Sequence, residues 1–178
     1  MSTSRLTPTS YVVLGMVAMR GPSTSYDLKR AVNHSVGYFW PFPHAQLYSE
    51  PKRLVTEGLL TMSSEDEGRR RQTFSITEEG MAELRAWLGE PTEEQLQVRD
   101  VAELKLFFGE FAQPEDILRL AQEQIAQHEQ RIAVYEEMQS RFGERDDMAD
   151  RMVPLQLGLE MEYAALGFWQ RLEKERSG

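Results

Sequence analysis

The fold is decided by the stretch Phe39-Trp40-Pro41-Phe42-Pro43-His44-Ala45-Gln46-Leu47-Tyr48, continued by Lys52-Arg53-Leu54-Val55 and Glu57-Gly58-Leu59-Leu60. Leu47, Leu54 and Val55 are spaced i, i+7 and i+8, which predicts a helix with one buried face. Pro43 is expected to open this helix, because proline is favoured in a first helical turn. The opposite face then turns four polar or basic side chains to solvent or to a partner: Gln46, Ser49, Lys52 and Arg53.

Two helices are predicted before this stretch. The first runs from Pro8 to Gly21-Pro22, with Thr7 as its N-cap. The second begins at residue 23, 24 or 25, where a serine or threonine can cap it, and Asp27 in its first turn suits the helix dipole. Four of its residues are expected to point inward: Tyr26, Leu28, Ala31 and Val32.

A β-hairpin and a fourth helix are predicted after it. Alternating residues at 59–63 and 72–76 indicate two strands, and the polar turn between them leads into Arg69-Arg70-Arg71. Thr77 can cap a helix that ends at Gly89 and carries Met81, Leu84, Trp87 and Leu88 inward. Three helices followed by a hairpin is the order of a winged helix-turn-helix domain, which we place at residues 1–90. The expected fold class is therefore mainly α with a small β-hairpin.

The second half predicts an antiparallel helical domain at residues 91–178, after a linker at 90–94. One helix is expected at 101–111, a long one from Pro114 to near Gly143, a mobile polar loop at 146–150, and a last helix from about Pro154 to Glu175. That last helix has two apolar stripes, and a lone helical hairpin cannot bury both. We therefore expect a second copy of the chain packed around a two-fold axis, so that this is a dimerisation domain. The stripes are Leu155, Leu159, Glu162, Leu166 and Trp169, and Leu157, Met161, Ala164, Phe168 and Leu172.

Charge divides the chain in the same place. The net charge is −9 over 178 residues, yet residues 1–90 hold 10 basic and 10 acidic side chains, whereas residues 91–178 hold 10 and 19. An acidic second half would face away from DNA, which supports two modules with different roles. The chain has no cysteine, and neither a signal peptide nor a membrane span is apparent, so we expect a cytoplasmic protein.

The first half resembles the PadR family of phenolic-acid-decarboxylase regulators, in its longer form with an extended helical C-terminal domain. The matching segments are Ser25-Tyr26-Asp27-Leu28, Phe39-Trp40, His44-Ala45-Gln46-Leu47-Tyr48, Lys52-Arg53-Leu54, Glu57-Gly58-Leu59-Leu60, Phe74-Ser75-Ile76-Thr77-Glu78-Glu79-Gly80, Leu84 and Trp87-Leu88. Two positions depart from the family pattern, Ser25 where glycine is common and Pro51 where leucine is common. A proline inside a helix removes a backbone hydrogen bond, so we expect a kink or distortion in the third helix.

The resemblance implies a homodimeric repressor that binds a palindromic operator on double-stranded DNA and is released by a small hydrophobic or aromatic effector. It places Gln46, Tyr48, Ser49, Lys52 and Arg53 at the major groove or its phosphates, and Arg69, Arg70 and Arg71 along the backbone or minor groove. It also places Tyr26 and His44 near the effector. For the effector lining in the second half, residue chemistry suggests Met161, Phe168 and Trp169.

Other classes of function have less support. No phosphate loop, dinucleotide fingerprint or nucleophile motif occurs, so we expect no enzyme and no cofactor. The three histidines are too scattered for a metal site. The acidic balance leaves open a winged-helix protein-interaction module with an acidic oligomerisation domain. Neutralisation of the basic residues by Glu50, Glu57, Glu65 and Glu67 would favour that alternative, and the sequence does not separate a repressor from an activator.

Overall fold

The structure is a computed structural model that describes residues 6–40, 43, 45–64 and 71–177. The chain divides into two compact units, Met1–Glu94 and Gln95–Gly178, called here the N-terminal and C-terminal units. Each unit is described by itself.

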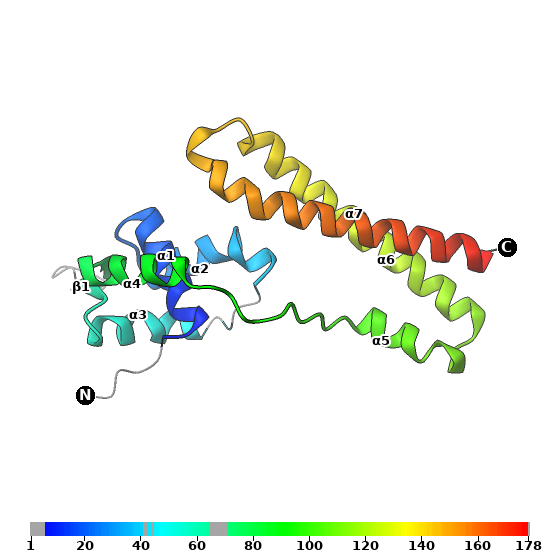
Figure 1. The fold of residues 1–178 in the computed structure, drawn as a ribbon, viewed down its shortest axis with the longest axis horizontal. Helices are drawn as coiled ribbons and strands as arrows, with labels where there is room; N and C mark the ends of the chain where they lie inside the picture. The colour runs from blue at the N-terminus through cyan, green and yellow to red at the C-terminus, as the bar shows by residue number, and fades with distance from the viewer. Residues whose placement is uncertain (1–5, 41–42, 44, 65–70, 178) are drawn as a thin grey trace. The chain divides into compact units, whose positions relative to one another are not determined.

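Among its described residues, the N-terminal unit contains four α-helices and a two-stranded hairpin (Figure 1). Side-chain caps fix two helix starts: the Thr24 hydroxyl accepts a hydrogen bond from the Asp27 N–H, and the Thr77 hydroxyl accepts one from the Gly80 N–H. The element bounds are α1 Pro8–Arg20, α2 Ser25–Asn33, a 3₁₀ turn at Val36–Tyr38, α3 Gln46–Thr56, β1 Leu60–Ser64, β2 Gln72–Ile76 and α4 Glu78–Gly89.

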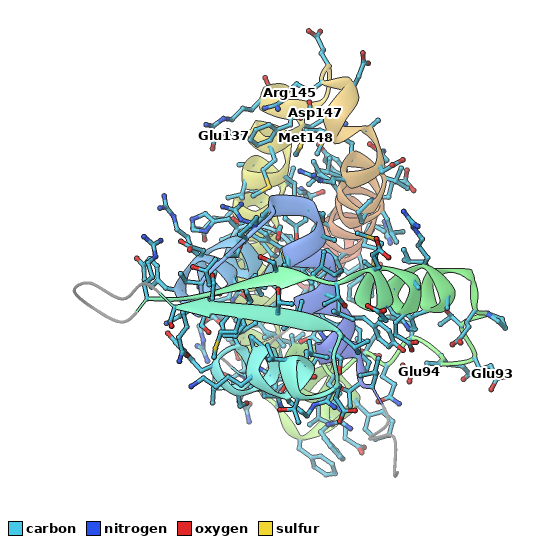
Figure 2. All side chains as sticks on the ribbon, turned by 90° about the vertical axis from the view of Figure 1, so that its left-hand side faces the viewer. Glu93, Glu94, Glu137, Arg145, Asp147 and Met148 are labelled. Atoms are coloured by element: carbon cyan, nitrogen blue, oxygen red, sulfur yellow. The ribbon has the colours of Figure 1, made fainter. Side chains whose placement is uncertain are left out.

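The hairpin is joined to the helices through its second strand. β1 and β2 pair antiparallel with Met62 opposite Phe74, and the two strands lie side by side in Figure 2. Phe74 also exchanges two backbone hydrogen bonds with Ser23, of 3.0 and 2.9 Å, and its side chain is buried. The core that α1 shares with the other elements comprises Val13, Leu14, Met16, Val17, Leu28, Val32, Leu47, Leu54, Leu60, Phe74 and Leu84. This arrangement confirms the predicted winged helix.

Two long antiparallel helices dominate the C-terminal unit, α6 Pro114–Phe142 and α7 Ala149–Ser177 (Figure 1). They are preceded by α5 Val101–Phe107 and a 3₁₀ turn at Gly109–Phe111. At the turn between the long helices, Arg145 forms an ion pair of 2.6 Å with Asp147 (Figure 2). Two apolar clusters hold the unit together, one around Leu120, Ala121 and Trp169 and one around Ile132, Tyr135 and Leu159.

Several predicted bounds were wrong. Helix α3 begins at Gln46 rather than Pro43. Residues 101–111 are a helix and a 3₁₀ turn rather than one helix, and the break falls at Phe108, just before Gly109, a poor helix former. The predicted loop at 146–150 is a 3₁₀ turn, Asp146–Met148, that leads straight into α7. Helix α7 therefore begins before Pro154 and contains it, with Asp150 in the first turn, where its charge suits the dipole.

Three predicted inward residues of the N-terminal unit, Tyr26, Trp87 and Leu88, were also wrong. Tyr26 is 67% exposed, because it precedes buried Leu28 by two positions and so points about 200° away around the helix. Leu88 is 68% exposed in the last turn of α4, where the described core has ended at Leu84. Its neighbour Trp87 is 39% exposed, because it lies over the outside of α1, where it stacks on Tyr11 with ring centroids 4.4 Å apart.

Candidate nucleic-acid interface

Helix α3 has one buried and one exposed face. Leu47, Pro51 and Leu54 are buried, whereas four sequence-predicted contact residues are exposed: Gln46, Tyr48, Ser49 and Lys52. The helix continues for five residues beyond Pro51, so the proline does not end it. The predicted kink stays a prediction. Since the buried face is fixed in the core, the exposed face is a rigid surface available to a partner.

Arg53 lies differently from its neighbour Lys52, because it is held by carboxylates. Its Nη2 and Nε donate to the two carboxylate oxygens of Glu50, at 2.6 and 3.0 Å, and its Nη1 lies 3.7 Å from Glu57. Glu50 and Glu57 flank Arg53 at i−3 and i+4, so this pairing could have been read from the spacing. The protein-interaction alternative requires that nearby glutamates neutralise the basic residues, and the pairing of Arg53 with Glu50 and Glu57 meets part of this requirement. The other two glutamates, Glu65 and Glu67, lie outside the described residues.

A buried hydroxyl of α1 bonds to both Glu50 and Arg53, and no sequence pattern predicted it. The Ser10 hydroxyl donates to Glu50 Oε1 at 2.6 Å and accepts from Arg53 Nη2 at 3.0 Å and from the Thr7 N–H at 2.9 Å. One donated and two accepted bonds satisfy the capacity of a hydroxyl. The Ser10–Glu50–Arg53 cluster, as we call these three side chains, therefore links the start of α1 to the middle of α3.

The environment of Glu50 favours its ionised form. Burial by itself would raise the pKa of this carboxyl, but the hydrogen bonds from Arg53 and Ser10 and the charge of Arg53 outweigh it and lower the pKa. Glu50 therefore stays negatively charged beside Arg53 at neutral pH. One turn earlier in α3, Gln46 accepts a second bond from α1, from the Thr9 hydroxyl at 2.9 Å.

The structure describes the two strands of the wing and Arg71. Arg69 and Arg70 lie outside the described residues. Arg71 is exposed and its Nη2 lies 3.4 Å from a carboxylate oxygen of Asp27. The pKa of Asp27 is lowered, first by the Thr24 hydroxyl that donates to it and to a lesser extent by Arg71. Arg71 is thus attached to the N-terminus of α2 by an exposed and weak ion pair.

The proposed effector residues fall in both units. Tyr26 is in the N-terminal unit, and His44 lies outside the described residues. Met161 and Phe168 are about half exposed on α7, whereas Trp169 is buried against Ala102, Leu120 and Ala121. Trp169 is therefore core of the C-terminal unit in the single chain.

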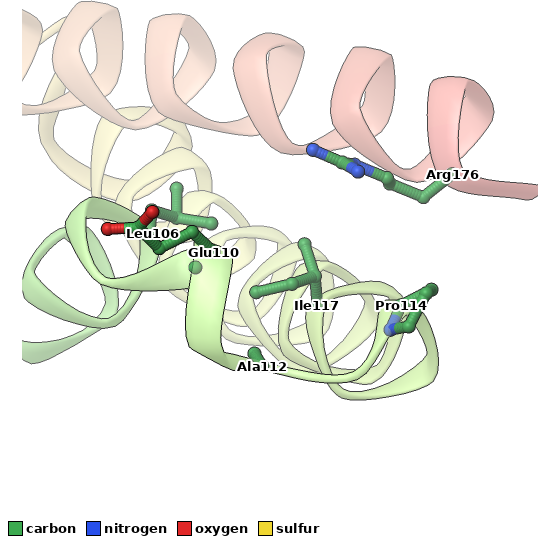
Figure 3. Close-up of a pocket in the computed structure, with 7 residues that line it drawn as sticks. Leu106, Glu110, Ala112, Pro114, Ile117 and Arg176 are labelled. Carbon is green, nitrogen blue, oxygen red and sulfur yellow. The ribbon is translucent and has the colours of Figure 1, made fainter.

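The C-terminal unit has a shallow depression of about 270 Å³ between the 3₁₀ turn that follows α5, the start of α6 and the end of α7. Figure 3 shows Arg176 reaching over it from α7, with Ile117 and Pro114 of α6 below and Glu110 at one side. None of the sequence-predicted effector residues lines it. In the part of the chain that the structure describes, no three acidic or histidine side chains are grouped to hold a metal ion, and no helix is long and apolar enough to cross a membrane.

Comparison with known proteins assigns the two halves. Residues 13–86 match the Transcriptional regulator PadR-like family, and residues 98–175 match the family named Virulence activator alpha C-term. Residues 13–86 are therefore similar to PadR-like domains. The predicted resemblance is thereby confirmed, and the family is one of transcriptional regulators rather than enzymes.

Similar proteins include a curated regulator and solved structures that share the fold over most of this chain. The negative transcriptional regulator PadR of Bacillus subtilis is 30% identical over 100 residues, 55% of this chain and 54% of that protein. The match thus spans about half the length of this curated relative. The crystal structure of B. subtilis PadR with operator DNA has a TM-score of 0.84 at 21% identity, covering 94% of this chain and 98% of that one. The structure of the Vibrio cholerae virulence activator AphA has a TM-score of 0.71 at 24% identity, covering 94% and 96%.

Proposed function

We propose that this protein is a sequence-specific DNA-binding transcriptional regulator that uses α3 of its PadR-like domain as the recognition helix. The observation that carries the proposal is the exposed polar face of α3, with Gln46, Tyr48, Ser49 and Lys52 opposite a face fixed in the core. Such a helix presents side chains to base edges and phosphates in the major groove. The wing residues Arg69, Arg70 and Arg71 would lie along the backbone or minor groove.

The regulator is proposed to act as a homodimer on a palindromic operator in the cytoplasm. One apolar stripe of α7 packs inside the C-terminal unit through Leu159 and Trp169. On the other stripe, Leu157, Met161 and Phe168 remain about half exposed in the single chain. A second copy could cover that stripe, and a two-fold axis would set two α3 helices on successive half-sites.

Release by a small aromatic effector completes the proposal. A crystal structure of B. subtilis PadR with p-coumaric acid has a TM-score of 0.79 at 20% identity, covering 98% of this chain and 99% of that one, so the same fold can accommodate an aromatic acid. Tyr26, His44, Met161, Phe168 and Trp169 are the candidate lining. Binding of the effector and binding of the operator would be coupled, since an effector that prefers one geometry of the dimer shifts the population of dimers toward that geometry.

One observation favours a second candidate, a winged-helix module that binds another protein. Arg53 and Arg71 are both paired with carboxylates, which reduces the positive charge available for phosphates. DNA binding remains the better supported candidate, because the PadR-like domain family is one of transcriptional regulators.

Fluorescence anisotropy separates the two candidates. The purified full chain is titrated against the duplex upstream of its own gene and against a pool of random duplexes, at two salt concentrations. We expect saturable binding to the upstream duplex that exceeds binding to the pool at both salts, and weakening by aromatic acids such as p-coumaric acid. Equal binding to both that vanishes with salt would count against autoregulation and favour the protein-binding candidate.

A further inference from the structure

Two adjacent basic residues of α3 have opposite surroundings. Lys52 is exposed, and no described side chain forms an ion pair with it. Arg53 has 30% of its side chain exposed and shares two hydrogen bonds with the Glu50 carboxylate, whose own side chain is only 13% exposed. Because these hydrogen bonds bring the two groups into contact, the positive charge of Arg53 is largely neutralised by the negative charge of Glu50.

The cluster is also anchored outside α3. The Ser10 hydroxyl is fully buried and bonds to both Glu50 and Arg53, so turning Arg53 toward solvent would break its bond to this hydroxyl as well as its two bonds to the Glu50 carboxylate. Breaking hydrogen bonds to a partly buried carboxylate costs free energy. Contact with a phosphate would have to offset that cost before Arg53 could neutralise it.

We propose that Glu50, anchored by Ser10, is a positioning residue that masks the charge of Arg53 from DNA, so that Arg53 braces the recognition helix and Lys52 provides its phosphate contact. The inference rests on the proposed function. Masking limits affinity for DNA of any sequence, because that affinity comes from neutralised phosphates. Sequence preference then depends more on the uncharged side chains of α3, namely Gln46, Tyr48 and Ser49, which can reach base edges.

The dependence of affinity on salt measures this masking directly. The slope of log K against log salt changes by about 0.9 for each phosphate neutralised. Four variants of the full chain are compared by anisotropy on the random-duplex pool and on the upstream duplex: Glu50→Gln, Lys52→Gln, Arg53→Gln and the double variant Glu50→Gln with Arg53→Gln. Circular dichroism establishes that each one folds.

Masking predicts a specific order of slopes. Per bound subunit, Glu50→Gln should steepen the slope, by at most about 0.9, and tighten binding to the random pool, because Arg53 then loses its contact with a carboxylate at Glu50 and keeps the longer 3.7 Å contact with Glu57. Lys52→Gln should flatten the slope by about 0.9, and Arg53→Gln should flatten it by less. In the double variant, the gain produced by Glu50→Gln should disappear.

Three results would overturn the inference. The first is a Glu50→Gln slope equal to that of the wild type. The second is a gain that persists in the double variant, because Glu50 would then act as a bare negative charge near DNA. The third is an Arg53→Gln loss as large as that of Lys52→Gln, a comparison that holds even if Glu50→Gln fails to fold. If the wild type binds no duplex DNA at low salt, both the proposed function and the inference fail. If the wild type prefers the upstream duplex and any of these three results is also found, only the inference is overturned.

Discussion

At the scale of single residues, sequence spacing predicts faces but not partners distant in the chain. The i, i+7 spacing of Leu47 and Leu54 placed both in the core, and Lys52 is exposed as the pattern requires. The position of Arg53 was harder to predict, since its hydrogen-bond partner Ser10 lies 43 residues away in the chain. Only tertiary packing brings α1 and α3 together, so a helical pattern alone left Arg53 on the outer face.

The Glu50 carboxylate should stabilise the N-terminal unit in a pH-dependent way. Because its pKa is lowered in the folded state, the stabilisation is present above its ordinary value of 4.5 and is lost as pH falls through the lower folded value. Glu50→Gln should therefore reduce the free energy of unfolding by about 1–3 kcal/mol at pH 7 and by less at pH 3. Urea unfolding followed by circular dichroism at both pH values measures this difference.

The matched control for that experiment is Glu93→Gln, which removes the same charge from an exposed carboxylate. It should change the free energy of unfolding little at either pH. A loss for Glu50→Gln that is the same at pH 3 as at pH 7 would mean that the ionised carboxylate is not what stabilises the contact between α1 and α3.

At the scale of elements, capping residues and turn chemistry located most helices of the winged helix. Thr77 predicted the start of α4, and Gly21-Pro22 predicted the end of α1. Pro154 misled the prediction for α7, because proline favours a helix start but does not require one. The 3₁₀ turn before α7 supplied a start that no residue pattern marked.

Gly80 marks a close approach between α4 and the hairpin with the residue that precedes it. A Cβ at this position would lie 2.1 Å from the Leu59 carbonyl oxygen and 3.1 Å from Ile76 Cγ1, so backbone would have to move. Gly80→Ala should therefore destabilise the chain by about 1–3 kcal/mol despite the better helix propensity of alanine. Urea midpoints measured by circular dichroism give the size of the effect.

Gly15→Ala is the comparison for that variant, because a Cβ at this interior position of α1 meets nothing within 4 Å. It should raise the free energy of unfolding by about 1 kcal/mol, the propensity difference between the two residues. Equal midpoints for the two variants would show that the contact of α4 with the hairpin yields easily.

At the scale of the whole molecule, the sequence pattern anticipated surface that a single chain leaves uncovered. The shift to acidic composition after residue 90 falls near the boundary between the two units, Glu94 and Gln95. The second apolar stripe of the last helix is largely exposed, as expected if a partner is needed to bury it. The identity of that partner does not follow from one chain, because any apolar surface can cover another.

A substitution in the exposed apolar surface of α5 and the turn that follows it tests the proposed homodimer. Phe107 and Phe111 are 80% and 79% exposed and Leu104 is 56% exposed, on and just after a helix of only seven residues. Placing a carboxylate there should oppose burial of this surface, since an unpaired charge is costly to desolvate. Phe107→Asp should therefore shift the full chain from dimer toward its monomer mass of 20.6 kDa in sedimentation velocity.

The DNA measurement then connects that dimer to function. If two recognition helices must engage two half-sites together, the monomer produced by Phe107→Asp loses the gain from bivalent contact, and its affinity for the upstream duplex should fall much more than its affinity for random duplexes. Leu96→Asp adds the same charge at an exposed apolar residue before α5 and should leave both mass and affinity close to wild type. A Phe107→Asp protein that remains dimeric would place the interface elsewhere, and one that is monomeric yet binds the upstream duplex as tightly as the wild type would contradict recognition by a dimer.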